Sequence, residues 1–238
     1  MRLGCRATAA RLAGLLIAAS VVGAAPAHAA GGPHIVDDAG TVAQGDCEVE
    51  AYGNTGPDVT GLGRAWRLVL SPTCAFKALG NFEIGVIAAA AGPPGARIIP
   101  GVSVKTGLGR IGPARLAVEA SLGFDPEGNQ QNYVSTNLPV SFDLAPWLEL
   151  HANAGVDFEP GNAGIPTFGV AALVTPLAGW QLVAEIAGRR GFATRGQWGV
   201  RHSTAKLNLD LMYSRSIDDS ARGNWLTFGL TWRFAHGR

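Results

Sequence analysis

The stretch TFGLTWRF, Thr227–Phe234, decides the fold of this chain. Small or polar residues separate its large apolar ones, so the alternation predicts a β-strand with one apolar and one polar face. A soluble domain would bury the apolar face in a core, whereas a membrane barrel would turn it towards lipid. The apolar residues share one parity: Phe228, Leu230, Trp232 and Phe234.

The beginning of the sequence predicts export. Arg2, Arg6 and Arg11 form a basic start, and the apolar run 12–23 that follows is too short to span a bilayer. Residues 27–29, Ala-His-Ala, fit the small-x-small cleavage pattern of a secretory signal peptide. We therefore predict a signal peptide over residues 1–29; an N-terminal anchor helix is the alternative.

Composition excludes several classes of protein. The chain has 33 glycines, 16% charged residues and a formal net charge of +1. No basic patch or strongly positive balance suggests nucleic acid as a partner. After the signal peptide no apolar run approaches the ~20 residues of a transmembrane helix.

Alternation with a period of two recurs along the rest of the chain and predicts twelve strands, most about ten residues long. An even number of such strands is typical of bacterial outer-membrane barrels. The predicted strands are Cys47–Gly53, Arg64–Leu70, Asn81–Ala90, Ala96–Lys105, Ala114–Phe124, Asn132–Phe142, Trp147–Phe158, Pro166–Val174, Trp180–Arg189, Gln197–Ser203, Lys206–Ser214 and Asn224–Phe234.

The connections and the aromatic residues favour the membrane barrel over a soluble sandwich or ligand-binding barrel. Longer connections such as residues 53–63 alternate with tighter ones such as residues 175–179, as expected of external loops and periplasmic turns. Aromatic girdles at the membrane interfaces are typical of such barrels. Several aromatic residues lie near strand ends: Trp66, Trp147, Trp180, Trp198, Tyr213, Trp225 and Trp232.

We therefore predict an all-β fold, a 12-stranded antiparallel up-and-down transmembrane β-barrel of the outer membrane, surrounded by lipid. Residues 30–45 are predicted to be a periplasmic N-terminal lead-in. The barrel is predicted over residues 46–234, and residues 235–238 are predicted to be a short C-terminal tail.

The last strand also resembles the C-terminal recognition signal of outer-membrane barrels. Thr227, Gly229, Trp232 and Phe234 fill the four places of the pattern T-x-G-x-x-W-x-F. The resemblance implies that the barrel-assembly machinery recognises this strand and inserts the chain into the outer membrane. The sequence departs from the pattern in its tail AHGR, because such chains commonly end on the aromatic residue.

A second resemblance lies in residues 34–53, HIVDDAGTVAQGDCEVEAYG. This stretch is similar to the opening of an outer-membrane transporter family named for the meta-cleavage pathway of phenol degradation, which implies transport of small aromatic or hydrocarbon compounds. Capping of the lead-in, or a calcium site, are alternative roles for the acidic pair in this stretch. The matching residues are Asp37, Asp38, Thr41, Gly45, Glu48 and Glu50.

Two cysteines are predicted to form a disulfide. Cys47 begins the first predicted strand and Cys74 follows the second, so a hairpin would bring them together near the periplasmic rim. Paired cysteines in exported proteins are commonly oxidised. Two free buried thiols are the alternative.

The polar face of the strands predicts a charged lumen. Enclosed charges must be hydrated or paired, and acids and bases of similar number allow ion pairs across it. Twelve strands lie between filled eight-stranded barrels and wide 16-stranded pores, so we expect a narrow pore for passive diffusion of small solutes. The predicted pore-lining residues are Glu48, Glu50, Arg67, Glu83, Arg97, Lys105, Arg115, Glu119, Glu149, His151, Asp157, Glu185, Arg189, Arg201, Asp210 and Arg233.

Two other functions remain open at this point. A lipid hydrolase would need a Ser–His–acid or Asp–His set at the surface, and His151 faces the lumen by parity while His202 lies at a turn without an acid neighbour. No G-x-S-x-G or metal-ligand spacing occurs, so we predict no enzyme, catalytic residue, metal or cofactor. A closed structural or adhesin-like barrel would need a fully ion-paired lumen.

Overall fold

The computed structural model describes residues 33–57, 64–76, 79–92, 97–124, 133–159, 161, 164–218 and 223–235. The predicted signal peptide lies outside these residues, as do residues 236–238 of the predicted tail and parts of the predicted external loops.

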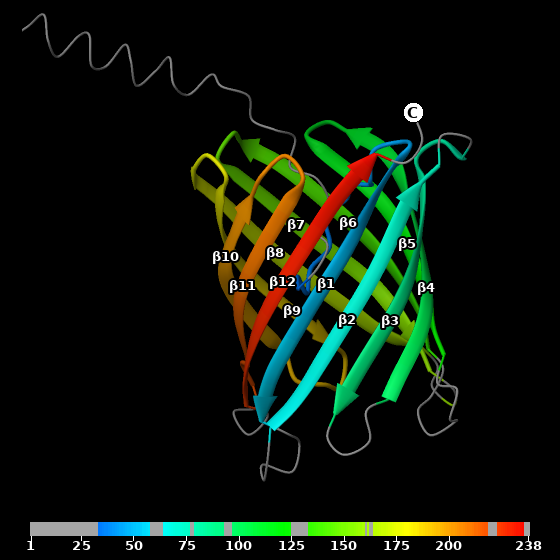
Figure 1. Cartoon of the computed structure of the whole chain (residues 1–238), viewed down its shortest axis with the longest axis vertical. Coiled ribbons are helices and arrows are strands. Elements are labelled where there is room, and N and C mark those ends of the chain that lie inside the picture. The colour runs from blue at the N-terminus through cyan, green and yellow to red at the C-terminus, as the bar shows by residue number, and fades with distance from the viewer. Residues whose placement is uncertain are drawn as a thin grey trace, which may run out of the picture.

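The described residues form a closed barrel in which each strand pairs antiparallel with its neighbours in sequence and β1 pairs with β12 (Figure 1). The predicted fold class is confirmed. No helix in this part of the chain is long and apolar enough to cross a membrane. The strands are β1 (Asp46–Pro57), β2 (Arg64–Ala75), β3 (Phe82–Gly92), β4 (Arg97–Ile111), β5 (Ala114–Gly123), β6 (Tyr133–Ala145), β7 (Leu148–Phe158), β8 (Ile165–Leu177), β9 (Trp180–Arg189), β10 (Arg195–Ser203), β11 (Leu207–Ser216) and β12 (Asn224–Ala235).

The two ends of the barrel differ in their connections. At one end β1 begins, β12 ends and tight turns join β4 to β5, β6 to β7 and β8 to β9; we call it the turn end, and it is uppermost in Figure 1. The opposite end, the loop end, carries the connections predicted to be external. Several of these are only partly described.

β12 shows how the sequence pattern becomes a barrel wall. Phe228 and Trp232 are 57% and 49% exposed on the outer surface, whereas Thr227 and Thr231, of the other parity, are 4% and 1% exposed. Side chains of a strand alternate between two faces, so the predicted apolar outward face and polar inward face of this strand are both confirmed. Arg233 has the inward parity and contacts Glu48 on β1.

Several strands extend beyond their predicted ends, and in the fourth strand a bulge interrupts the alternation. The fourth strand was predicted over Ala96–Lys105, but β4 runs over Arg97–Ile111. Its pairing with β5 shifts between Gly107 and Gly109, and Gly109 has a φ of 104°. A bulge adds one residue and exchanges the two faces, so the period-two pattern ends before the strand does.

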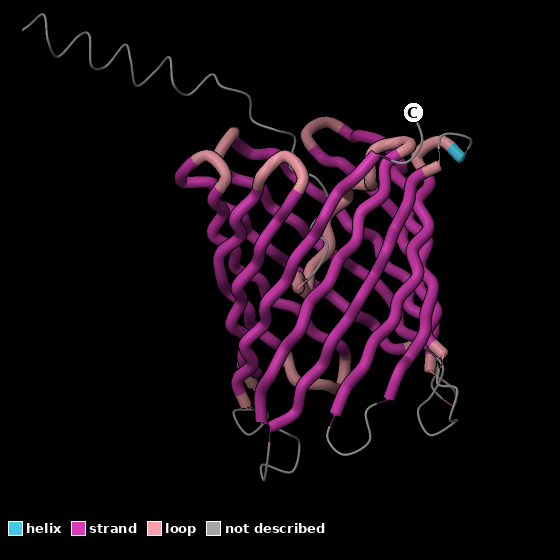
Figure 2. The backbone as a smooth tube through the Cα atoms, viewed as in Figure 1, coloured by secondary structure: helices cyan, strands magenta, loops and turns pink. Residues whose placement is uncertain are grey.

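The predicted periplasmic lead-in is placed differently. Its described part, residues 33–45, lies inside the barrel and extends from its middle to the turn end (Figure 2). We call these residues the luminal segment. They show no strand alternation, and inward polar side chains of the wall pair with their backbone groups. A buried backbone polar group is costly when it is left unpaired, so these contacts hold the segment in the lumen.

Candidate functional site: the lumen and the luminal segment

His34 anchors the luminal segment to the charged wall. Its Nδ1 lies 2.9 Å from Oε1 of Glu185 on β9, and its Nε2 lies 3.6 Å from Oδ1 of Asp210 on β11. Arg201 on β10 donates from Nε to the same Asp210 oxygen at 2.7 Å. Burial and the charge of Arg201 act to lower the pKa of His34, but the two carboxylates outweigh them and raise it above its ordinary value.

The tip of the segment is held by an amide and accommodated by a glycine. Gln197 on β10 donates from Nε2 to the Pro33 carbonyl at 2.8 Å and to Glu185 Oε2 at 2.7 Å. A Cβ atom at Gly229 on β12 would lie only 2.6 Å from Cδ of Pro33. Gly229, predicted as part of the assembly signal, therefore also makes room for the segment.

Val36 gives the segment an apolar contact with the wall. It is fully buried among inward residues of β8, β9 and β11: Ala171, Leu173, Val183 and Met212. Val183 and Met212 share the parity of the predicted polar faces of their strands, and Ala171 and Leu173 also face inward. Apolar side chains on the inner face of a barrel were therefore a sequence signal that something covers them.

Asp37 joins the segment to β6 and β7. Its backbone N–H donates to Oδ1 of Asn153 at 2.7 Å, and its carbonyl accepts from Nδ2 of the same residue at 2.8 Å. Its carboxylate accepts from Nδ2 of Asn137 at 3.0 Å. Asn153 thus pairs with both backbone groups of one residue, as a neighbouring strand would.

The remainder of the segment contacts β3 and β4. The Val42 N–H donates to Oε2 of Glu83 at 2.6 Å, and Asp38 lies 3.8 Å from Nζ of the buried Lys105. No group of three or more metal-binding side chains gathers among the described residues, so the calcium site considered for the acidic pair gains no support.

A serine, a histidine and a glutamate lie next to one another on the inner wall. Ser141 Oγ is 2.8 Å from Nδ1 of His151, whose Nε2 is 3.8 Å from Oε2 of Glu149. The buried Ser141 hydroxyl also accepts the backbone N–H of Ala39 at 2.7 Å. The luminal segment therefore covers the serine, and an ester has no approach to it.

The structure places the predicted pore-lining residues in three groups. Glu83, Lys105, Glu185 and Asp210 contact the luminal segment. A second group forms ion pairs along the wall: Glu48 with Arg233, Arg201 with Asp210, Arg189 with Asp157, Arg115 with Asp143, and His151 close to Glu149.

The rest of the predicted set comprises Glu50, Glu119, Arg67 and Arg97. Glu50 and Glu119 are partly buried on the inner wall, and Arg67 is exposed. The side chain of Arg97 lies outside the described part. In the sequence, the pattern of charged residues does not indicate the neutral amides and the hydroxyl that hold the segment: Asn137, Ser141, Asn153 and Gln197.

Towards the loop end, the lumen keeps positive charge that the wall does not neutralise. Arg67 on β2 and Arg195 on β10 are both exposed. Neither forms an ion pair with a carboxylate in the described part of the chain, and their like charges repel each other. Arg195 is two residues from Gln197, which holds the tip of the luminal segment.

The predicted disulfide is present. Cys47 and Cys74 face each other in the β1–β2 register with their Cα atoms 4.1 Å apart, and their sulfurs are bonded. The bond lies at the turn end, where the luminal segment leads into β1. Among the other predicted assembly-signal residues, the rings of Trp232 and Phe234 contact each other at 5.0 Å between centroids.

A closed antiparallel barrel with a charged interior and an apolar exterior defines the class of outer-membrane β-barrels, and solved structures agree. The KdgM porin in complex with disordered oligogalacturonate has a TM-score of 0.60 at 11% identity over 79% of this chain and 99% of that chain. The COG4313 outer membrane channel from Pseudomonas putida F1 gives 0.61 at 9% identity, covering 82% and 97%. The Ralstonia pickettii toluene transporter TbuX gives 0.50 at 10% identity, covering 82% and 90%.

At these identities the similarity shows the fold alone. The similar structures are porins and channels, which are not enzymes. Residues 18–234 match the family described as "Uncharacterised conserved protein UCP029691", and the chain belongs to this family. A comparison with curated proteins gives no match.

Proposed function

We propose that the protein is an outer-membrane channel through which small solutes diffuse passively, with its turn end in the periplasm. The observation that carries the proposal is the closed barrel with an apolar outer face and a charged inner face. Short turns on the periplasmic side and longer loops outside are the usual arrangement of such barrels. Export by a signal peptide and insertion by the barrel-assembly machinery belong to the same proposal.

The luminal segment sets the conductance of this channel. Its contacts with β3, β4, β6, β7, β9, β10 and β11 place it across the lumen rather than along one wall. Protein interiors leave little unfilled space. Solutes therefore pass either beside the luminal segment or after the segment moves.

The class of solute is a narrower proposal. The resemblance to the phenol-pathway family suggests small aromatic or hydrocarbon compounds, and a toluene transporter shares the fold. A porin that binds oligogalacturonate shares it too, and the exposed Arg67 and Arg195 suit anionic solutes better than hydrocarbons. Uptake into proteoliposomes of a neutral aromatic compound and of an acidic sugar, compared at equal concentration, separates the two classes.

The closed structural barrel is the second candidate, and the luminal segment is the observation that favours it. Single-channel recording in planar bilayers tests both, using wild-type protein and the variant Val36→Asp. A carboxylate at this buried position would be uncompensated, which costs several kcal/mol and dislodges the segment.

We expect small conductance steps from the wild type and clearly larger steps from Val36→Asp. The control Val36→Ala loses only about 1–2 kcal/mol of apolar burial and should be intermediate. A difference in gel migration between boiled and unboiled samples confirms that each protein is folded. Folded wild-type and Val36→Asp protein that both fail to conduct would contradict the channel and support the closed barrel.

A further inference from the structure

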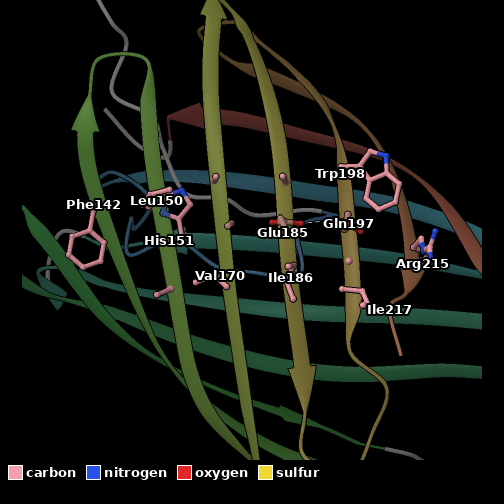
Figure 3. A pocket seen from close by; sticks show the side chains of 15 residues that line it. Phe142, Leu150, His151, Val170, Glu185, Ile186, Gln197, Trp198, Arg215 and Ile217 are labelled. Atoms are coloured by element: carbon pink, nitrogen blue, oxygen red, sulfur yellow. Dashed lines mark hydrogen bonds between the residues drawn. The ribbon is translucent and has the colours of Figure 1, made fainter. Parts of the chain in front are cut away.

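A cavity of about 720 Å³ lies on the outer wall of the barrel over β6 to β11 (Figure 3). Most of its lining side chains have the outward parity, and no residue of the luminal segment lines it, although Glu185 on the other side of the wall contacts that segment. The cavity is therefore a groove on the lipid-facing surface and is separate from the lumen.

One cross-strand row of residues explains the shape of the groove. Leu150, Ala172, Ala184 and Trp198 are paired in this order from β7 to β10. The two alanines form a low floor, and the leucine and the tryptophan stand as walls on either side. Ile217 closes the side towards the loop end.

A single cation borders this apolar groove. Arg215, two residues before Ile217, is exposed and has the outward parity of β11. None of the described carboxylates forms an ion pair with it. The other outward lining side chains are apolar, so among the described lining residues this guanidinium is the single charged group on the lipid side.

We propose that the groove binds a phosphorylated lipid of the outer leaflet, with an acyl chain over Ala172 and Ala184 and a phosphate on Arg215. This inference rests on the proposed outer-membrane location. Ligand pockets are commonly 300–1,000 Å³ in volume, mostly apolar, and oriented by a few polar groups, as this groove is. An arginine matches phosphate with two parallel hydrogen bonds.

The position of Arg215 selects the leaflet. β11 runs from the turn end to the loop end, and Arg215 is its penultimate residue. With the turn end in the periplasm, this guanidinium lies towards the external interface, where lipid phosphates are found. Trp198 and Tyr213 contact each other beside it at 5.0 Å between ring centroids, and aromatic rings are typical of this depth.

The test uses the folded full chain in detergent, titrated with lipid A and with the same lipid after its phosphates are removed. Native mass spectrometry counts the bound lipid. We expect Arg215→Ala and Ala184→Phe each to weaken binding of phosphorylated lipid A about tenfold, the loss of one charge-assisted contact or of one filled groove. Dephosphorylated lipid should bind wild type as weakly as lipid A binds Arg215→Ala.

Two matched controls should bind like wild type. Ala88→Phe adds the same ring at an exposed outward position of β3, and Arg190→Ala removes a cation from the turn after β9. Equal binding of both lipids to the wild type, or unchanged binding to Arg215→Ala and Ala184→Phe, would show general lipid contact and overturn the inference. A dimer that Ala184→Phe disperses would assign the groove to a second copy and also overturn it.

Conductance of the same samples keeps the two proposals apart. If the barrel conducts but shows no preference for phosphorylated lipid A, only the lipid site is contradicted. If it binds phosphorylated lipid A but does not conduct, only the channel function is contradicted.

Discussion

From the middle of the barrel to the turn end, the lumen holds residues 33–45, and its charges face partners: Glu185 and Asp210 face His34, and Lys105 faces Asp38. Towards the loop end, Arg67 and Arg195 remain exposed. Paired charges in a filled space resist passage, whereas exposed charges in an open space attract counter-ions. In the proposed channel, the filled half would therefore restrict flow, and the exposed arginines of the other half would select the solutes that enter.

The filled half of the lumen also carries the Cys47–Cys74 disulfide. Removing this bond should have the largest effect on the stability of the barrel. In Cys47→Ser/Cys74→Ser the constraint on a sequence separation of 27 residues is lost, which amounts to about 3.5 kcal/mol of unfolding free energy. Urea unfolding of folded barrels measures this loss. Alkylation of two thiols in wild-type protein without reductant would contradict the bond itself.

The next effect concerns the charge of His34. Its pKa is raised, so the protonated form holds Glu185 and Asp210, and this stabilisation is complete below pH 6.5 and is lost as pH rises through the raised value. We expect the open probability of the channel to rise at alkaline pH, by about tenfold once His34 is neutral. Single-channel recording across this range measures it.

His34→Gln is the matched control for this pH dependence. It keeps a donor near Glu185 but cannot take up a proton, so its open probability should stay flat where the wild type changes. An equal pH response in both proteins would assign the titration to other groups of the wall.

Arg67 and Arg195 allow a test of ion selectivity at the loop end of the lumen. Arg67→Ala/Arg195→Ala removes two exposed positive charges from the lumen, so the ratio of chloride to potassium permeability should fall severalfold at low salt, where screening is weak. Reversal potentials in a salt gradient measure the ratio. Arg190→Ala, which lies in the turn beyond β9, should leave it unchanged.

The smallest effect should come from Gly229→Ala. The added methyl would meet Pro33 at 2.6 Å and push the tip of the segment, raising conductance slightly. The folded fraction on gels should stay as in the wild type, because alanine is small enough for the strand. A loss of folded protein without a change in conductance would instead assign Gly229 to assembly alone.

The fold could be predicted because the side-chain period of a strand is short and repeats twelve times. The inward charges followed from the same parity, and the disulfide followed from the ends of two neighbouring strands. Bulges, as between Gly107 and Gly109, are local and have no periodic signal, so the strand ends were misplaced there.

The luminal segment could not be predicted from periodicity, because it has none. Its position depends on side chains more than forty residues away in sequence, such as Asn153 and Glu83. The one available signal was indirect. Ala171, Leu173 and Val183 are apolar at inward positions, which would be unfavourable in a water-filled lumen.

The pairing of β1 with β12 also constrains the order of assembly. The luminal segment directly precedes β1, and the barrel becomes a closed ring only when β1 meets the last strand of the chain. Because the luminal segment is joined covalently to β1, the strand that completes the wall also carries the segment that fills it. Pairing of the first and last strands therefore fixes one end of the segment at the closing seam.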